Sequence, residues 1–395
     1  MKSIKLTLAF ELQINANIVQ GLVTLGYFES SEHLSLALGT EAENVLIVSP
    51  FEKENKLTNG VTERKLAVNR KITALETAKF LSLKNKWLKY FKQSRNPQDI
   101  LLIGTATNLL AYSINENTDI FYKDIPDGVH VIRFSSKSAF ENNQGVAVVG
   151  GNCSIQAFDE QGEECFWTVT SDNVKSMIIF DVDNDGKNEL IIGSEDCHIR
   201  VFKQGEMCNE IHVIPFFALK IFKKVKECAF NIVNYIDYIV KGKFAYALDN
   251  GTVGVYCGQK KLWKYQSKEK ATCLHAVLIE SEQVLVVGWS NSAEIQLRSA
   301  SDGNVLWQTR INNGGNIVGL IIGDLRGHGH DQIIAVTNKG MITGWSTQPS
   351  KASVDSISSS ISEQKEANDD LTQKDGDLFE KKILFSNFKK KLVTK

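Results

Sequence analysis

The stretch Leu190-Ile-Ile-Gly193, followed by Ile199-Arg-Val-Phe202, decides the fold of this chain. Two short apolar runs, rich in β-branched residues, flank a polar turn, and this pattern is typical of a β-hairpin. An isolated hairpin is marginally stable in water, because it cannot bury its own apolar side chains. The stretch must therefore belong to a larger sheet.

The same hairpin pattern returns along the chain. Further copies begin at Leu36, Leu101, Ala147, Ala245, Leu285 and Ile333, and the last one ends at Trp345. Successive glycines Gly104, Gly150 and Gly193 lie 46 and 43 residues apart. A propeller blade has four strands, and its sequence repeat is about 40–50 residues long. The sequence therefore predicts an all-β fold, a seven-bladed β-propeller over residues 1–345.

Two segments interrupt the repeat. In the first, residues 55–98, the apolar residues from Ile72 to Leu81 lie near helical spacing, although a strand with an inserted loop also fits. In the second, residues 211–241, apolar residues from Phe217 to Ile239 follow each other at spacings of three and four, and lysines occupy the opposite face. Three interpretations stay open for 211–241: an inserted helix on a blade edge, a membrane-surface helix, or an artefactual insert such as a retained intron.

The composition changes after Trp345. The last 50 residues contain nine serines and many charges, and we predict a disordered linker over residues 346–370. Leu371, Leu378, Phe385 and Leu392 then recur every seven residues. This spacing predicts the possible start of a coiled coil over residues 371–395, with an unstructured tail as the alternative. The C-terminal tail is thus expected to be short and either disordered or helical.

The strongest chemical motif begins at Asp181 and reads DVDNDGKNE. Carboxylates at Asp181, Asp183, Asp185 and Glu189 suit a hard cation such as calcium. An EF-hand would need an acid at its twelfth position, where this chain has Ile192, so the motif fits a strand–loop–strand connection instead. A structural calcium site and a metal-free turn, in which the carboxylates cap backbone amides, are both open.

A degraded copy of this motif runs from Gly323 to Asp331. It retains Asp324 and Asp331 and places His328 and His330 between them. A zinc site normally needs three or four converging ligands, so the sequence favours a decayed turn at this position.

Composition and motifs narrow the function. The chain has 45 Lys and Arg against 46 Asp and Glu, a balance that argues against a nucleic-acid binder. It contains no nucleophile elbow, no P-loop and no dinucleotide fingerprint. We therefore predict a protein that is not an enzyme and requires no cofactor. The alternatives are a propeller enzyme of the lyase or hydrolase type, with acids or histidines converging at the axis, and a calcium-stabilised propeller interaction module.

Several strings resemble one family. They are LIGTATNLLAY from Leu102, GGNC from Gly150, FWTVTSDNV from Phe166, DVDNDGKNELIIGSED from Asp181 and DNGTVGVY from Asp249. These strings are similar to the N-terminal part of the Bardet–Biedl syndrome 2 family of BBSome subunits, over roughly residues 4–345. The family runs without an insert at 211–241, and it continues past the propeller through a coiled coil and further domains.

The resemblance implies a scaffold role. It implies a subunit of the BBSome, a coat-like complex that carries membrane proteins to and from cilia and supports cilium assembly. Implied partners are other BBSome subunits, especially the seventh Bardet–Biedl protein, chaperonin-like assembly factors, and ciliary membrane cargo reached through the complex. The implied locations are the cilium, its membrane, the basal body and the cytoplasm.

Overall fold

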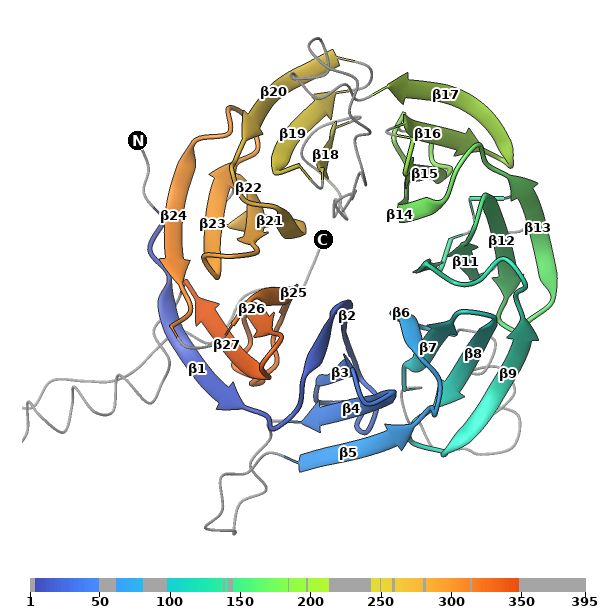
Figure 1. The fold of residues 1–395 in the computed structure, drawn as a ribbon, viewed down its shortest axis with the longest axis horizontal. Helices are drawn as coiled ribbons and strands as arrows, with labels where there is room; N and C mark the ends of the chain where they lie inside the picture. Colours follow the sequence, from blue (N-terminus) through green and yellow to red (C-terminus); the bar gives the residue numbers. More distant parts are fainter. Residues whose placement is uncertain are drawn as a thin grey trace, which may run out of the picture. The chain divides into compact units, whose positions relative to one another are not determined.

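Seven antiparallel sheets surround a common axis and form a ring (Figure 1). This computed structural model describes residues 4–49, 62–80, 98–137, 139–140, 145–183, 185–196, 198–212, 243–248, 250–257, 260–279, 282–312 and 315–347. Every regular element among these residues is a strand. Within them, no helix is long and apolar enough to cross a bilayer. The seven-bladed propeller predicted from the repeat is confirmed.

The first four blades each contain four consecutive strands, ordered from the axis outward. Blade 1 contains β2 (Ile18–Gly26), β3 (Ser35–Thr40), β4 (Asn44–Ser49) and β5 (Thr62–Ala67). Blade 2 contains β6 (Ile72–Ala78), β7 (Ile100–Thr105), β8 (Asn108–Ser113) and β9 (Thr118–Asp124). Blade 3 contains β10 (Val131–Ser135), β11 (Val146–Gly150), β12 (Ser154–Asp159) and β13 (Glu164–Val169). Blade 4 contains β14 (Val174–Phe180), β15 (Glu189–Ser194), β16 (His198–Lys203) and β17 (Glu206–His212).

The last three blades complete the ring. Blade 5 contains the described strands β18 (Lys243–Ala247), β19 (Thr252–Cys257) and β20 (Lys260–Gln266). Blade 6 contains β21 (Ala271–Ile279), β22 (Glu282–Trp289), β23 (Glu294–Ser299) and β24 (Val305–Arg310). Blade 7 contains β25 (Ile317–Gly323), β26 (Gln332–Thr337) and β27 (Met341–Ser346), and its outermost strand is the N-terminal β1 (Thr7–Gln13). The two ends of the propeller sequence therefore meet in one sheet, with Thr7 opposite Ser346.

The predicted hairpins are the two middle strands of the blades. Middle strands such as β7 and β15 are buried along their whole length, because neighbouring blades cover both faces. Both faces then select apolar side chains, which explains the unbroken apolar runs. Outermost strands such as β9 alternate between exposed and buried residues. The sequence pattern thus distinguishes the middle strands, which are apolar throughout, from the outermost strands, which alternate.

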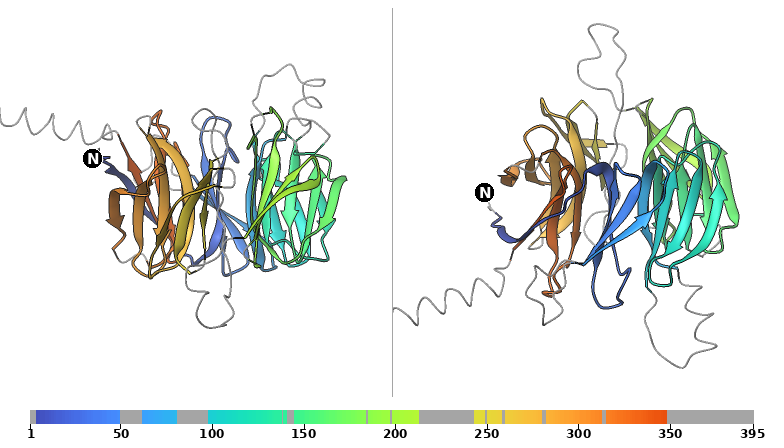
Figure 2. Two further views of the ribbon diagram at one scale, coloured as in Figure 1. Left: turned by 90° about the horizontal axis from the view of Figure 1, so that it is seen from above. Right: turned by 60° about the horizontal axis from the view of Figure 1, so that its bottom comes forward.

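The hydrophobic core lies between blades rather than at the axis. Each of seven clusters of buried side chains joins two neighbouring blades; the one between blades 1 and 2, for example, combines Leu22 and Val45 with Ile72 and Leu101. Figure 2 shows the blades standing side by side around the ring. Every blade is therefore stabilised by both of its neighbours.

The structure decides one of the open interpretations, and the other interrupted segments lie largely outside the described residues. The strand interpretation of the segment from Ile72 is confirmed, because 72–78 is β6, whose residues pack against the neighbouring blade. Ile211 and His212 belong to β17, and the remainder of the predicted 211–241 insert lies outside the described residues. The linker and coiled coil predicted for 346–395 also lie outside them, apart from the end of β27 and the residue after it.

Candidate functional site

The acidic loop from Asp181 to Glu189 joins β14 to β15 in blade 4. Asp181 accepts two backbone N–H groups, from Gly186 at 2.9 Å through Oδ2 and from Asp185 at 3.2 Å through Oδ1. Gly186 has a φ of 87°, a conformation that glycine adopts without strain. Glu189 is only 2% exposed, and its Oε2 accepts the N–H of Val182 at 2.8 Å. Carboxylates thus close the loop by capping its amides.

Three of the four predicted metal ligands lie together. Carboxylate oxygens of Asp181, Asp183 and Glu189 lie within 4.8 Å of one another, a group that does not include Asp185. Lys203 stands opposite Glu189 in the β15–β16 register. Its Nζ contacts Asp183 Oδ2 and lies 2.8 Å from Asp185 Oδ2 and 3.4 Å from Glu189 Oε1. The ammonium group is therefore placed where a bound cation would neutralise the acids.

The charges in this loop stabilise one another. Hydrogen bonds to Asp183 and Asp185 raise the pKa of Lys203. The bond to Lys203 lowers the pKa of Asp185, whereas burial raises the pKa of Glu189. The arrangement can hold a cation, either the lysine ammonium or a hard divalent ion. Sequence reasoning missed Lys203, whose role depends on pairing across two strands.

Asp324 has the same place in blade 7. It follows β25, and its carboxylate accepts the N–H of His328 at 2.9 Å and of Gly329 at 2.6 Å. These donors lie four and five residues after the acid, as Asp185 and Gly186 do after Asp181. The degraded sequence copy therefore forms the same turn.

Gln332 replaces the buried glutamate in the blade 7 turn. Gln332 is fully buried, and its Oε1 accepts the N–H of Leu325 at 3.0 Å, as Glu189 accepts that of Val182. A neutral amide thus closes this turn. The blade 7 turn therefore forms without a negative charge at the position that Glu189 occupies in blade 4.

A second polar cluster lies on the strands nearest the axis. Arg133 of β10 donates from Nη1 to Glu76 Oε2 on β6 at 2.9 Å, and from Nε to the carbonyl of Met177 on β14 at 2.9 Å. It therefore ties blades 2, 3 and 4 together. Burial raises the pKa of Glu76, and the charge of Arg133 opposes that shift. Because the carboxylate of Glu76 is already bonded to the guanidinium of Arg133, the arrangement fits a structural role in holding neighbouring blades together.

His275 of β21 belongs to the same electrostatic environment. Burial lowers the pKa of His275 to about 4, and the charge of Arg133 lowers it further, while a hydrogen bond with the backbone of Leu320 opposes the shift. The imidazole is therefore neutral at pH 7. The titratable groups of this cluster are thus the neutral imidazole of His275 and the carboxylate of Glu76, which is paired with Arg133.

We expect acid to destabilise the propeller through His275. The unfolded histidine binds a proton near pH 6.5, but the folded one does so only near pH 4, so stability should fall as the pH drops through that window. The expected loss for a partly buried group is about 1–3 kcal/mol. Urea denaturation at pH 7, 5.5 and 4.5 measures it, and His275→Gln should flatten the slope. Burial also lowers the pKa of His130. Comparing the slopes of His130→Gln and His275→Gln shows how much of the pH dependence each histidine causes. An unchanged slope in His275→Gln would contradict the assignment.

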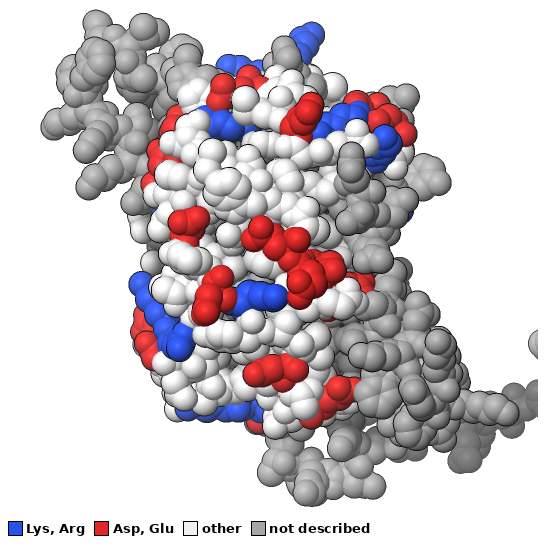
Figure 3. Space-filling view, turned by 90° about the vertical axis from the view of Figure 1, so that its right-hand side faces the viewer, with Lys and Arg blue, Asp and Glu red and all other residues white. Residues whose placement is uncertain are grey.

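The outer strands expose several apolar side chains. Trp167 and Val169 on β13 are 53% and 64% exposed, and Met207 on β17 is 55% exposed. Figure 3 shows this side of the ring, where uncharged surface separates scattered acidic and basic side chains. Trp167 and Val169 both point outward, because residues alternate between the two faces of the outermost strand.

Comparisons with known proteins match this chain to one family of BBSome subunits. A family model described as "Ciliary BBSome complex subunit 2, N-terminal" matches residues 24–135, and one described as "Ciliary BBSome complex subunit 2, middle region" matches residues 176–298. The chain is 33% identical over 347 residues to BBSome complex member BBS2 of Danio rerio, covering 85% of this chain and 44% of that protein. It is 34% identical over 346 residues to BBSome complex member BBS2 of Homo sapiens, covering 85% and 43%. The chain thus spans less than half the length of these relatives.

Solved structures share the fold at low identity. The BBS1 N-terminal domain, crystallised in complex with ARL6, aligns with a TM-score of 0.65 and 11% identity over 87% of this chain and 98% of that one. The WD40 β-propeller domain of Doa1 aligns with a TM-score of 0.59 and 11% identity, over the same fractions of the two chains. Identities this low establish the propeller fold alone.

Proposed function

The chain belongs to the ciliary BBSome complex subunit 2 family, and on that premise we propose that it acts as a non-enzymatic scaffold subunit of the BBSome. In this role it would help to carry membrane proteins to and from cilia and support cilium assembly. The observation that carries the proposal is the 33–34% identity over 85% of the chain, which extends across the blades rather than one motif.

The proposed partners and locations follow from this role. The partners are other BBSome subunits, especially the seventh Bardet–Biedl protein, with chaperonin-like factors during assembly and ciliary membrane cargo bound through the complex. The locations are the cilium, its membrane, the basal body and the cytoplasm. Exposed Trp167 and Val169 support a role in protein contacts, because apolar side chains exposed close together commonly mark interaction surfaces.

Affinity purification tests the scaffold role. The tagged 395-residue chain is expressed in ciliated cells, and a tagged unrelated propeller of similar size serves as the control. We expect other BBSome subunits, the seventh Bardet–Biedl protein among them, to co-purify with this chain and not with the control. A chain that is folded and soluble but enriches no BBSome subunit would refute the proposal.

We also propose that the acidic loop of blade 4 is a structural calcium site. Asp181, Asp183 and Glu189 would bind the ion, and Asp185 could join them once Lys203 moves away. The support is the group of three carboxylates, together with a buried oxygen of Glu189, Oε1, that accepts no hydrogen bond among the described residues and lies 3.4 Å from Lys203 Nζ. Calcium and the lysine ammonium would compete for the same acids.

Removing Lys203 should reveal whether its ammonium group competes with calcium for the acids of the loop. Lys203→Met should make the protein calcium-responsive, with a stabilisation of about 2–3 kcal/mol at calcium concentrations near 100 times the dissociation constant. Thermal unfolding in 5 mM CaCl₂, MgCl₂ or EGTA measures the response. Glu189→Gln in the Lys203→Met background should abolish it while the loop still folds, as the turn with Gln332 does in blade 7. Equal melting temperatures of Lys203→Met in CaCl₂ and in EGTA would exclude the site.

A further inference from the structure

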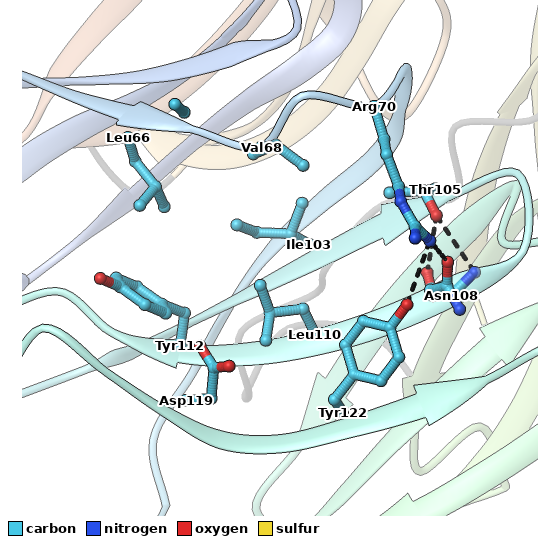
Figure 4. Close-up of a pocket in the computed structure, with 11 residues that line it drawn as sticks. Leu66, Val68, Arg70, Ile103, Thr105, Asn108, Leu110, Tyr112, Asp119 and Tyr122 are labelled. Atoms are coloured by element: carbon cyan, nitrogen blue, oxygen red, sulfur yellow. Dashed lines mark hydrogen bonds between the residues drawn. The ribbon is translucent and has the colours of Figure 1, made fainter.

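A cavity of about 370 Å³ lies between blades 1 and 2 on the side of their outer strands (Figure 4). This volume is within the usual range of ligand sites. One wall is formed by Leu66 of β5 and Val68, and the other by Leu110 of β8 and Tyr122 of β9. Ile103 of β7 lies between the walls. The cavity therefore has an apolar interior that would accept an aliphatic or aromatic side chain.

The guanidinium group of Arg70 stands at one end of the cavity. Its Nη1 donates to Asn108 Oδ1 and, at 3.1 Å, to the hydroxyl of Tyr122. The orientation of Asn108 is fixed, because its Nδ2 donates to Asp124 Oδ1 at 2.7 Å. Asn108 is buried, so it holds Arg70 from inside the blade. The position of the positive charge is thus determined by neighbouring side chains.

Both direct partners of Arg70 are neutral. No ion pair joins it to an acid in the part of the chain that the structure describes. Its Nε and Nη2 donate to no other described residue, so one edge of the guanidinium fork is open. A planar guanidinium with two free donors is suited to bidentate recognition of a carboxylate. This end of the cavity therefore selects an acidic group.

Asp119 of β9 lies at the opposite end of the cavity (Figure 4). Its side chain is exposed, and it forms no ion pair with any described residue. A ligand that lies along the cavity would thus meet a positive group first, then apolar surface, then a negative group. A fatty acid would satisfy only the first two. A peptide can present all three, because its side chains differ from one residue to the next.

We propose that this cavity binds an extended peptide segment of a partner protein. The segment carries a large apolar side chain that enters between Val68 and Leu110, an Asp or Glu that pairs with Arg70, and a Lys or Arg near Asp119. Exposed Tyr122, which is 48% accessible, provides additional contact area at the entrance. The site does not depend on incorporation into the BBSome, so it goes beyond the scaffold role.

A displayed library of random 12-residue peptides tests the proposal on the complete 395-residue chain. We expect enrichment of peptides in which a large apolar residue is flanked by an acidic residue. The leading sequence is then synthesised with a fluorophore, and its dissociation constant is measured by anisotropy. Arg70→Glu should weaken binding at least tenfold, and Arg70→Gln should weaken it several-fold.

A double-mutant cycle separates direct pairing from indirect effects. Changing the acidic residue of the peptide to its amide should weaken binding to the unmodified chain but not to Arg70→Glu. Lys65→Glu is the matched control, because Lys65 is an exposed basic residue of β5 that does not line the cavity, and the substitution makes the same change of charge. Circular dichroism and melting temperature verify that both variants are folded.

Three results would overturn the proposal. One is the absence of any enriched peptide. Another is a peptide that binds Arg70→Glu and the unmodified chain equally well. The third is binding of decanoate, used as a fatty-acid probe, that depends on Arg70 when no peptide does. A failure of the chain to enter the BBSome would leave these measurements unaffected, so the two proposals are tested separately.

Discussion

Replacing Phe10 with alanine should lower the free energy of unfolding by about 3–5 kcal/mol. Phe10 is 7% exposed and lies opposite Gly344 in the β1–β27 pair. Its ring covers the backbone of Gly344 so closely that a Cβ atom there would lie 2.2 Å from the ring. The same ring belongs to the cluster that joins blade 7 to blade 1. Loss of Phe10 therefore weakens both the closing strand and the last inter-blade interface.

Leu8→Ala is the matched control for Phe10→Ala. Leu8 lies on the same strand, and it is 53% exposed, so its truncation should change stability by less than about 0.5 kcal/mol. Urea denaturation followed by tryptophan fluorescence compares the midpoints of the two variants. If both variants unfold at the same urea concentration as the original chain, β1 does not determine closure of the ring.

Replacing Asp196 with alanine should cost about 3 kcal/mol, because it leaves a buried arginine without its main partner. Arg200 is 4% exposed, and its Nη2 donates to Asp196 Oδ2 at 2.5 Å. Its remaining contacts are Ser194 Oγ at 2.6 Å and the more exposed Glu210 at 2.7 Å. Ser194 is neutral and Glu210 is 41% exposed, so the variant retains a poorly compensated charge.

The loss of stability in Asp196→Ala should depend on pH, because the pKa of Asp196 is shifted in the folded protein. Burial raises this pKa, but hydrogen bonds from Arg200, Ser194 and the N–H of His198 outweigh burial and lower it to about 2, from an ordinary 3.8. A lowered pKa means that the contribution is complete above about pH 4 and is lost as the pH falls toward 2. The stability difference between Asp196→Ala and the original chain should therefore shrink in that range.

An exposed ion pair provides the control for Asp196→Ala. Arg310 and Glu294 lie 3.0 Å apart in blade 6, and the arginine is 66% exposed. Glu294→Ala should cost less than about 1 kcal/mol, since exposed pairs contribute little. Denaturation curves at pH 7 compare the two alanine variants. Equal losses would show that burial of Arg200 does not set the penalty.

The sequence identified the seven hairpins correctly, because a hairpin is local and both of its strands are buried on both faces. Leu101–Tyr112 and Leu190–Phe202 show why: their apolar runs need only neighbours a few residues away to be recognised as strands. The strand from Ile72 was harder to identify from its spacing. The buried residues of β6, which are Ile72, Ala74, Leu75 and Ala78, do not alternate strictly along the strand, so their spacing shows no clear period of two.

Part of the acidic loop was also predictable. The residues from Asp181 to Glu189 are contiguous, so their spacing alone indicated a turn rich in oxygen ligands. Lys203 was not predictable, because it reaches the loop through the β15–β16 register rather than through the spacing of the motif. The sequence therefore left a cation site and a metal-free turn open, and the structure adds a lysine ammonium group that contacts the same acids.

What the sequence determined by itself was the repeat, and with it the blade, the fold class and the family. What only the tertiary structure decided was every contact between distant segments: β1 beside β27, Arg133 linking three blades, and Arg70, from the connection between blades 1 and 2, bonded to Asn108 and Tyr122 of blade 2. The physical reason is that local patterns record whether a residue is buried, whereas closure of the ring determines which residues bury it.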